Sequence, residues 1–460
     1  MIQKEEPVQK AVIIQERLNL ENIIEVFEKS KSGGSLANNV LEFKQKAFDR
    51  FTEIGLPTSK EEIWKYVNLK PLYSANLTKN TSNQRSINEE LKTHIKVNFL
   101  KECSGACLVF LDGNYEESLS DLSDLDGKAT ISKLEDCVKY DSSYETDDPL
   151  QLLNSIFFEN GLLIKLDKET CLEKPIQILS LSSANVYSCY PRIYFELEER
   201  SSALVTFVSE TLNLASDVSL HVQPSNSVCN NIVLQANLKQ ASKLDLTFIQ
   251  NEDKPLQTQE NTKKYLSFAF TKVQQEADSD FSLHSFSLGA NLSRHRVEVD
   301  LNGERARTSL NGLYVLSDSN SSHNQLVLNH NVPNCFSEQV YKGILDDEAH
   351  AEFTGTINVL RNAQKTDARQ LNKNLLISNE AKIYTRPQLQ IEADDVKCSH
   401  GATIGQLEEE QIFYLTSRGI SKNEAKQILT YGFAEEIIEK VKLPSLRTRL
   451  DAIFLGNIHH

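Results

Sequence analysis

The sequence lacks any run of apolar residues long enough to cross a bilayer. It also lacks the signature of a secretory or transit peptide, because residues 1–7 (MIQKEEP) are polar and acidic. Positive charge is in deficit: the formal net charge is −15 at pH 7, which argues against a broad surface for nucleic acid or anionic membranes. These absences predict a cytoplasmic protein with neither a nucleic-acid nor a membrane partner.

Clustered cysteines are missing as well. The chain has 8 cysteines, scattered along its length rather than grouped as in a disulfide-stapled secreted domain. Cys103 and Cys107 are close in sequence, but their C-x3-C spacing lacks the second half that a zinc site would need. We therefore expect reduced cysteines, most of them acting as small hydrophobic residues in strands.

The sequence motifs of several common enzyme classes are absent too. There is no G-x-x-x-x-G-K-[ST] loop for ATP and no G-x-G-x-x-G after a strand for a dinucleotide. A G-x-S-x-G elbow, an H-E-x-x-H pair and paired C-x-x-C motifs are also missing. The sequence therefore argues against each of these enzyme classes.

Hydrophobic periodicity divides the 460 residues into three predicted domains. Residues 1–159 are predicted to be mainly helical. Within residues 160–400, apolar and polar side chains alternate, as in Leu162–Leu166 and Val297–Leu301, with polar turns between such runs. Residues 401–460 return to a helical pattern.

The long middle series of short strands fits a sandwich, a barrel or a parallel β-helix, and the pattern alone does not choose among them. Two Leu-Asn-Gly units, at 301–303 and 310–312, are expected to mark corners between strands. No exact repeat is visible, although the coils of a solenoid need only a recurring strand and turn.

The C-terminal segment carries clear helix boundaries. Gly419 is a suitable residue just beyond a helix that starts near Glu408, and Ser421 with Glu424 predicts a capping box for the next helix. The apolar surface of that next helix is broad. The helical pair would either pack entirely on the β domain or offer part of its surface to a partner, and the pattern leaves both open.

The stretch DDVKCSHGAT, residues 394–403, places a thiol and an imidazole two residues apart after a strand-like run. Because residues i and i+2 of a strand face the same side, Cys398 and His400 would present sulfur and nitrogen ligands together. Such a pair suits iron or zinc. Two ligands alone do not make a metal site, so Cys398 as a buried hydrophobic residue and His400 as a partner of Asp394 or Asp395 stay open.

The surrounding sequence changes the weight of these alternatives. From Tyr341 the chain reads YKGILDDEAH, then GTINVLRNAQKTDARQLNKNLLIS, then PQLQIEADDVKCSHGATIGQLEEEQIFYLTSRGISKNEA. This order and spacing resembles the core signature of the SufB/SufD family, the scaffold components of the SUF iron–sulfur assembly system. The chain looks most like the D paralogue, because Asn374 stands where the B paralogue has a cysteine and Ser399-His400-Gly401 stands where it has Glu-His-Glu.

The resemblance implies a right-handed parallel β-helix core flanked by N-terminal and C-terminal α-helical domains. It implies a non-enzymatic scaffold subunit that pairs with a SufB-like paralogue and a SufC-like ABC ATPase. A nascent iron–sulfur cluster would be assembled transiently at the interface between the B and D subunits. Cys398 and His400 would be its ligands from this chain, which by itself would hold no tightly bound cofactor.

The resemblance also implies that the C-terminal helical segment docks the ATPase. Within that segment Tyr414, Tyr431 and Phe433 are the predicted partner contacts. A homodimer is a further state open to the isolated chain. The alternative from another functional class is a β-helix enzyme acting on polysaccharide. The terminal pair His459-His460 is too short to interpret.

Overall fold

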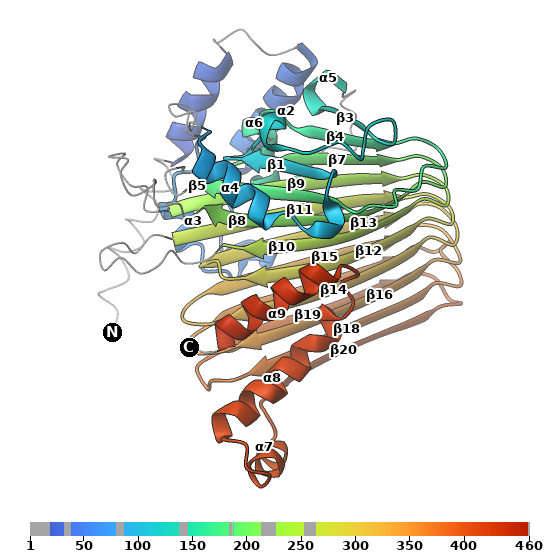
Figure 1. Cartoon of the computed structure of the whole chain (residues 1–460). Helices are drawn as coiled ribbons and strands as arrows, with labels where there is room; N and C mark the ends of the chain where they lie inside the picture. The colour runs from blue at the N-terminus through green and yellow to red at the C-terminus, as the bar shows by residue number, and fades with distance from the viewer. Residues whose placement is uncertain are drawn as a thin grey trace.

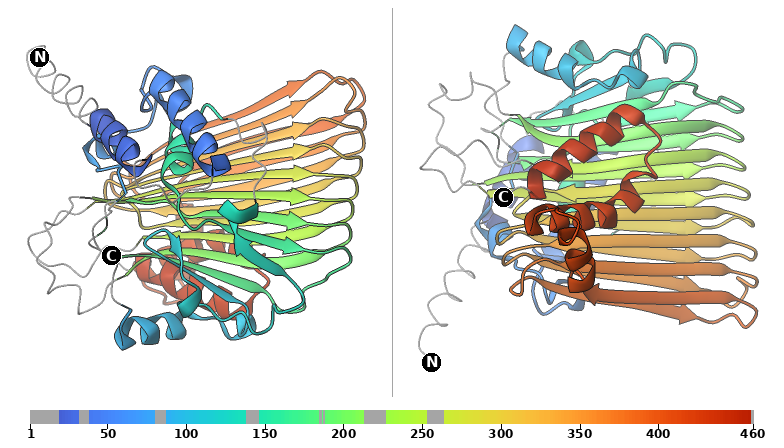
Figure 2. Two further views of the ribbon diagram at one scale, coloured as in Figure 1. Left: turned by 90° about the horizontal axis from the view of Figure 1, so that it is seen from above. Right: turned by 60° about the horizontal axis from the view of Figure 1, so that its bottom comes forward.

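The computed structural model describes residues 19–31, 38–79, 87–137, 146–183, 186, 188–212, 227–252 and 264–458. His459 and His460 lie outside these residues. Two stacked β-sheets form the body of the molecule, and helices lie on the outer faces of both (Figures 1 and 2). None of the described helices is long and apolar enough to span a membrane.

The first sheet is parallel apart from one strand at its edge. In spatial order its strands are β2 (Asn114–Tyr115), β1 (Cys107–Leu111), β5 (Ile176–Ser183), β8 (Ser202–Leu212), β10 (Lys243–Asn251), β12 (Asp280–Leu288), β14 (Arg307–Leu316), β16 (Phe336–Leu345), β18 (Asp367–Leu376) and β20 (Lys397–Gly405).

The second sheet is built in the same way. Its strands are β19 (Lys382–Ile391), β17 (His350–Val359), β15 (Ser321–His330), β13 (Leu292–Leu301), β11 (Lys264–Gln275), β9 (Ser227–Leu238), β7 (Arg192–Leu197), β4 (Leu162–Leu166) and β3 (Thr130–Lys133), with β6 (Ser188–Cys189) beside β9. From β7 onward the chain alternates between the sheets, one strand in each per coil. This arrangement confirms the parallel β-helix flanked by helices.

Tight corners join the coils, and glycine is required at one of them. A Cβ atom at Gly303 would lie 1.9 Å from the backbone nitrogen of Ala277, so the first Leu-Asn-Gly unit does mark a corner. The second unit does not, because Gly312 lies inside β14. There a Cβ atom would lie 2.2 Å from the ring of Tyr341, which fills the space beside the glycine. The expected second corner is therefore wrong: this glycine accommodates a neighbouring aromatic ring.

The space enclosed by the two sheets, here called the lumen, is the largest hydrophobic core of the molecule. Because the strands pair in register, side chains at one position stack from coil to coil. One inward-facing stack, here called the His400 column, runs along the first sheet. Its members, in order, are Ile176, Val205, Leu246, Leu283, Leu310, Gln339, Gln370 and His400.

Helices cover the outer faces of the sheets. On the first sheet lie α4 (Glu89–Asn98), α8 (Lys422–Ile438) and α9 (Pro444–Ile458). On the second lie a helix over residues 19–31, α2 (Asn38–Ile54), α3 (Lys70–Ser74) and α6 (Pro149–Phe157). The remaining elements are the short helices α5 (Leu134–Cys137) and α7 (Glu409–Thr416) and the 3-10 turns η1 (Glu62–Trp64), η2 (Lys101–Cys103) and η3 (Glu117–Leu119).

The two ends of the β-helix differ. At the first end, β2 pairs antiparallel with β1 and β3 pairs antiparallel with β4, which closes both sheets. At the other end β20 and β19 are the outermost strands, and within the described residues no strand covers them. Most of their side chains are exposed or half-buried, unlike those of the coils before them. The last coil is therefore open.

Candidate metal centre

Cys398 and His400 lie on β20, in this open last coil. Cys398 pairs in register with the buried Ala368 and packs against the lumen core. His400 pairs with Gln370, which is only 3% exposed. Since alternate residues of a strand share a face, both side chains belong to the lumen side of β20. Cys398 is half-buried and His400 is exposed at the mouth of the lumen.

The thiol of Cys398 is adjusted by its surroundings. Burial raises the pKa of Cys398, and the nearby Asp367 carboxylate raises it further, whereas a hydrogen bond with the backbone of Ala368 opposes the rise. The free thiol is therefore protonated at neutral pH. A metal ion would have to displace that proton, so binding at this sulfur would become stronger as pH rises.

The two aspartates before β20 belong to the corner that leads into it. The Asp395 backbone nitrogen donates to Oε1 of Gln364 at 2.9 Å, and the Asp395 carbonyl accepts from the Lys365 backbone nitrogen at 2.6 Å. Both aspartates are exposed. Over the described residues, no group of three or more His, Cys, Asp or Glu side chains is placed to hold a metal ion. Cys398 and His400 thus lie as a pair of candidate ligands at the edge of the fold, here called the half-site.

Next to this half-site the lumen is polar. Gln370 Nε2 donates to Oε1 of Gln339 at 2.9 Å, and Asn372 Nδ2 donates to the Tyr341 carbonyl at 3.1 Å. The hydroxyl of Tyr314 donates to the side-chain carbonyl of Asn374. The sequence did not single out these residues, because polar side chains of an alternating strand usually lie on the solvated face. Once the strand register is known, these residues can be identified because they occupy matching luminal positions in successive coils.

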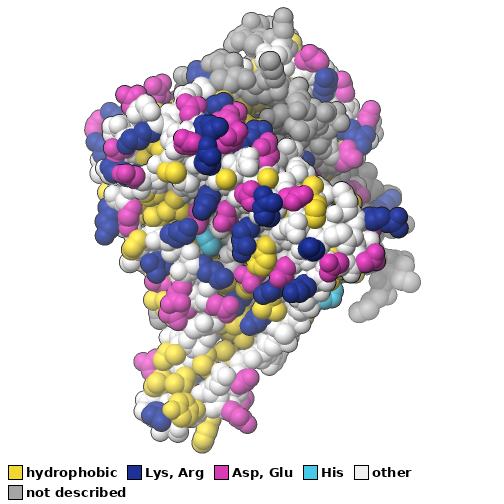
Figure 3. Space-filling model, turned by 90° about the vertical axis from the view of Figure 1, so that its right-hand side faces the viewer, with side chains coloured by type: hydrophobic (Ala, Val, Ile, Leu, Met, Phe, Trp, Pro, Cys, Tyr) yellow, Lys and Arg dark blue, Asp and Glu magenta, His cyan; other side chains and the backbone are white. Residues whose placement is uncertain are grey.

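The predicted partner contacts lie in different environments. Tyr414 is on α7 and is 55% exposed, beside Phe413, which is 73% exposed. Tyr431 and Phe433 are on α8 and are half-buried. Hydrophobic side chains gather on the protruding lower end of the molecule (Figure 3).

Tyr431 and Phe433 make contacts within the chain. The Tyr431 hydroxyl donates to Oδ1 of Asp451 at 2.9 Å, which joins α8 to α9. Nζ of Lys342 lies 4.6 Å from the centre of the Phe433 ring and donates to the Phe433 carbonyl at 2.9 Å. Lys342 also pairs with Glu436 at 2.5 Å. The three Lys342 contacts fasten α8 to β16. Of the three predicted aromatic residues, only Tyr414 is therefore more than half exposed.

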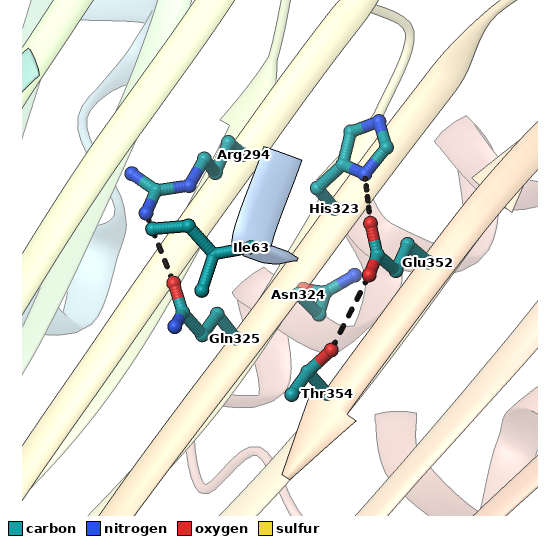
Figure 4. Close-up of a pocket in the computed structure, with 7 residues that line it drawn as sticks. All are labelled: Ile63, Arg294, His323, Asn324, Gln325, Glu352 and Thr354. Atoms are coloured by element: carbon teal, nitrogen blue, oxygen red, sulfur yellow. Dashed lines mark hydrogen bonds and ion pairs between the residues drawn. The ribbon is translucent and has the colours of Figure 1, made fainter. Parts of the chain in front are cut away.

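A small pocket lies on the outer face of the second sheet, beside η1 (Figure 4). His323 Nδ1 lies 3.3 Å from Oε2 of Glu352 there, and Arg294 pairs with the buried Asp148 at 2.7 Å. The ring of Trp64 covers the Arg294 guanidinium at 4.3 Å. These groups tie the N-terminal segment to the sheet. The lining residues are Ile63, Arg294, His323, Asn324, Gln325, Glu352 and Thr354.

Comparison with known proteins agrees with this architecture. A family model described as the SufBD core domain, of SUF system FeS cluster assembly, matches residues 181–433, and a model of the SufBD N-terminal region matches residues 24–178. An iron–sulfur cluster assembly SufBD family protein of Synechocystis sp. is 30% identical over 92% of this chain and 92% of its own length.

A second relative, the iron–sulfur cluster assembly protein SufD of Escherichia coli, is 30% identical over 88% of this chain and 90% of its own length. The chloroplastic protein ABCI7 of Arabidopsis thaliana is 36% identical over 46% of this chain and 42% of its own. These matches argue against the alternative of a β-helix enzyme that acts on polysaccharide. The chain therefore belongs to the SufBD family of SUF-system iron–sulfur cluster assembly proteins.

Proposed function

We propose that this chain is the D-type scaffold subunit of a SUF assembly complex. Its open last coil pairs with the β-helix of a SufB-like paralogue, and a nascent iron–sulfur cluster is built transiently between the two subunits. Cys398 and His400 supply ligands from this side. The chain performs no hydrolysis itself, and the energy comes from a SufC-like ABC ATPase bound to its C-terminal helices.

The observation that carries the proposal is the coincidence of the half-site with the uncovered end of the β-helix. Exposed strand edges are templates for pairing with another chain, and proteins usually cover or blunt them. Here both last strands are uncovered within the described residues, and β20 presents Ile404 with 50% of its surface exposed. A partner that covers this coil would bring its own side chains to Cys398 and His400.

A shared site suits a transient cargo. An imidazole and a thiolate occupy only part of the coordination of a cluster iron, so the rest must come from the cluster sulfides and the partner. Ligands divided between two subunits hold the cluster only while the subunits keep their relative placement. Movement at the interface would then release it. The isolated chain, with half of the site, is expected to bind no cluster tightly and would use the same open end to form a homodimer.

The ATPase contact is proposed at α7 and the adjoining part of α8. Phe413, Tyr414 and Ile428 are exposed hydrophobic residues there. Large apolar side chains that are exposed and grouped together are typical of interaction sites. Tyr431 and Phe433 support this surface indirectly, because their contacts hold α8 against α9 and β16. Movement of the docked ATPase would reach the β-helix through the Lys342–Glu436 pair.

Co-expression with a SufB-like paralogue and a SufC-like ATPase tests both surfaces together. We expect Ile404→Asp to abolish capture of the paralogue and to leave capture of the ATPase intact. Phe413→Asp should do the reverse, because it places a charge in the other apolar surface. The matched control is Val97→Asp, because the native valine is 80% exposed and belongs to α4. Helix α4 lies at the opposite end of the β-helix from β20 (Figure 1).

The two capture patterns must separate for the proposal to stand. If Ile404→Asp captures the paralogue as well as the Val97→Asp control does, the last coil is not the interface. Normal ATPase capture by Phe413→Asp would move the docking site away from α7. Circular dichroism of each variant establishes that the β-helix is folded.

A further inference from the structure

The buried amides beside His400 are an unusual feature of the lumen. Gln339 and Gln370 follow Leu310 in the His400 column and are 0% and 3% exposed. Gln370 Nε2 donates to Gln339 Oε1, but the other two amide atoms, Gln370 Oε1 and Gln339 Nε2, are buried without a hydrogen-bond partner. A buried polar atom without a partner is unfavourable, because it has lost its hydrogen bonds to water. Leucine at both positions would continue the apolar column without that cost, so packing does not explain the pair.

The opposite sheet is adapted to the same amide. Gly355 lies in the middle of β17, at a position where the preceding coils carry Thr271, Val297 and Leu326. A Cβ atom on Gly355 would lie 1.8 Å from Nε2 of Gln370. Glycine inside a strand weakens it, and one such position often marks a close approach by another group. A second unfavourable feature is thus present at the same place, and its effect is to make room for the Gln370 side chain.

We propose that Gln370 is a positioning residue for His400. Its side-chain carbonyl oxygen accepts a hydrogen bond from one ring N–H of His400, which leaves the lone pair of the other ring nitrogen for iron at the open mouth. The inference rests on the proposed function, in which His400 is a ligand. Histidines that bind metals usually donate their second ring N–H to a carbonyl or carboxylate, which fixes both tautomer and ring orientation.

The geometry of the column supports this assignment. Gln370 and His400 are register partners on adjacent parallel strands, and such strands lie about 4.8 Å apart, within reach for two long side chains. Gln339 Oε1 accepts from the nitrogen end of Gln370, so the carbonyl end of Gln370 takes no part in that bond. Cys398 has only Ala368 beneath it in the neighbouring stack, so the amide serves the imidazole.

The test compares Gln370→Met with Gln339→Met in the full-length chain. Methionine is close to glutamine in size and cannot accept a comparable hydrogen bond. Both substitutions remove the Gln370–Gln339 bond, but only the first removes the oxygen next to His400. The readout is the 15N NMR spectrum of histidine-labelled protein at fixed pH, with the His400 ring signals assigned by their loss in His400→Ala.

We expect one ring tautomer of His400 in the wild type and in Gln339→Met, and a mixture in Gln370→Met. Gln370→Leu is the second variant and should behave as Gln370→Met does. In the assembled complex, loss of the supporting acceptor should lower cluster content about 10- to 100-fold, as second-layer changes at metal sites do.

An unchanged His400 spectrum in both Gln370 variants would overturn the inference. So would an equal change in Gln339→Met, because that result would indicate a packing effect. The outcome for the proposed function is separate: normal cluster content in His400→Ala would reject the ligand role, whereas the tautomer result depends only on the Gln370–His400 hydrogen bond.

Discussion

The early coils and the last coils of this β-helix share one backbone architecture, but the His400 column has a different character in each. In the early coils the His400 column is aliphatic, and the neighbouring stack contains Phe207 and Phe248, whose rings are 5.0 Å apart. In the last coils the same column carries Gln339, Gln370 and His400. The first end is closed by antiparallel strands, and the last is open.

This difference suggests that the early coils supply most of the stability of the β-helix, whereas the last coils carry the candidate functional residues. A solenoid gains stability coil by coil from contacts with its neighbours, and its terminal repeats are normally covered. The buried aromatic and aliphatic side chains of the early coils supply that stability. Polar members of the His400 column and an uncovered edge are expected to lower the stability of the last coils, and both lie beside Cys398 and His400. Substitutions in the two regions should therefore have different consequences.

The largest expected effect is in the early coils. Phe248→Ala removes a fully buried ring that stacks on Phe207, so we expect the free energy of unfolding to fall by about 3–5 kcal/mol. Chemical denaturation followed by circular dichroism measures it. Ile404→Ala in the last coil is the comparison and should cost under about 1 kcal/mol, because that side chain is half exposed already. Equal losses would erase the proposed contrast between the regions.

A smaller loss is expected where the glycines of the later coils accommodate tyrosine rings. Gly312→Ala would put a Cβ atom 2.2 Å from Tyr341, which is fully buried and cannot move away easily. Overpacking of this kind costs about 1–3 kcal/mol. The double variant Gly312→Ala with Tyr341→Leu should recover part of the loss. A neutral Gly312→Ala, measured by the same denaturation, would show that this part of the lumen is loosely packed.

Two buried histidines predict how stability responds to acid. Burial lowers the pKa of His295 to about 3 and that of His330 to about 4, against about 6.5 in an unfolded chain. Between these values the unfolded state binds protons that the folded state does not, so each histidine lowers stability as pH falls below about 6.5, by up to about 1.4 kcal/mol per pH unit.

His330→Gln isolates that effect. The free energy of unfolding would be measured at pH values from about 4.5 to about 6.5. Its slope against pH should decrease in the variant by the amount that corresponds to about one proton bound on unfolding. The expected glutamine partner is the Ser337 hydroxyl, which lies 2.9 Å from His330 Nε2. An unchanged slope would mean that His330 is protonated in the folded protein.

The smallest effect on stability is expected at the half-site itself. Ser399→Ala changes an exposed side chain of β20 and should alter the free energy of unfolding by no more than about 0.5 kcal/mol. His400→Ala also removes the proposed hydrogen bond to Gln370 and should cost about 0.5–1.5 kcal/mol. The larger difference between the two variants should appear in cluster assembly. A loss of stability in His400→Ala well above that range would assign the imidazole a structural role.

Local rules predicted much of the fold correctly. Ser421 and Glu424 form the expected capping box of α8, and Gly419, with φ of +92°, lies just past α7 as expected. The alternation in Leu162–Leu166 and Val297–Leu301 predicted β4 and β13. These features depend on neighbours in sequence, which is why they could be read from the sequence itself.

Features that depend on contacts between coils could not be predicted in this way. Gly312 was assigned to a corner, because its role depends on Tyr341 in the next coil. Gln370 resembles a solvent-facing residue until the register places it in the lumen. Tyr431 was predicted to be a partner contact, and only the packing of α9 shows its bond to Asp451. For Cys398 and His400, strand alternation was sufficient to place both side chains on one face.

The most direct test of the account is the iron and acid-labile sulfide content of the assembled complex. The complex of this chain with its SufB-like and SufC-like partners would be isolated anaerobically as wild type, His400→Ala, Cys398→Ser with His400→Ala, and the neighbouring control Ser399→Ala. The account predicts intact complexes in all four, with cluster lost in both variants that lack His400 and retained in Ser399→Ala. Normal iron and sulfide in the double variant would contradict it, and the open last coil would then be an interface without a cluster site.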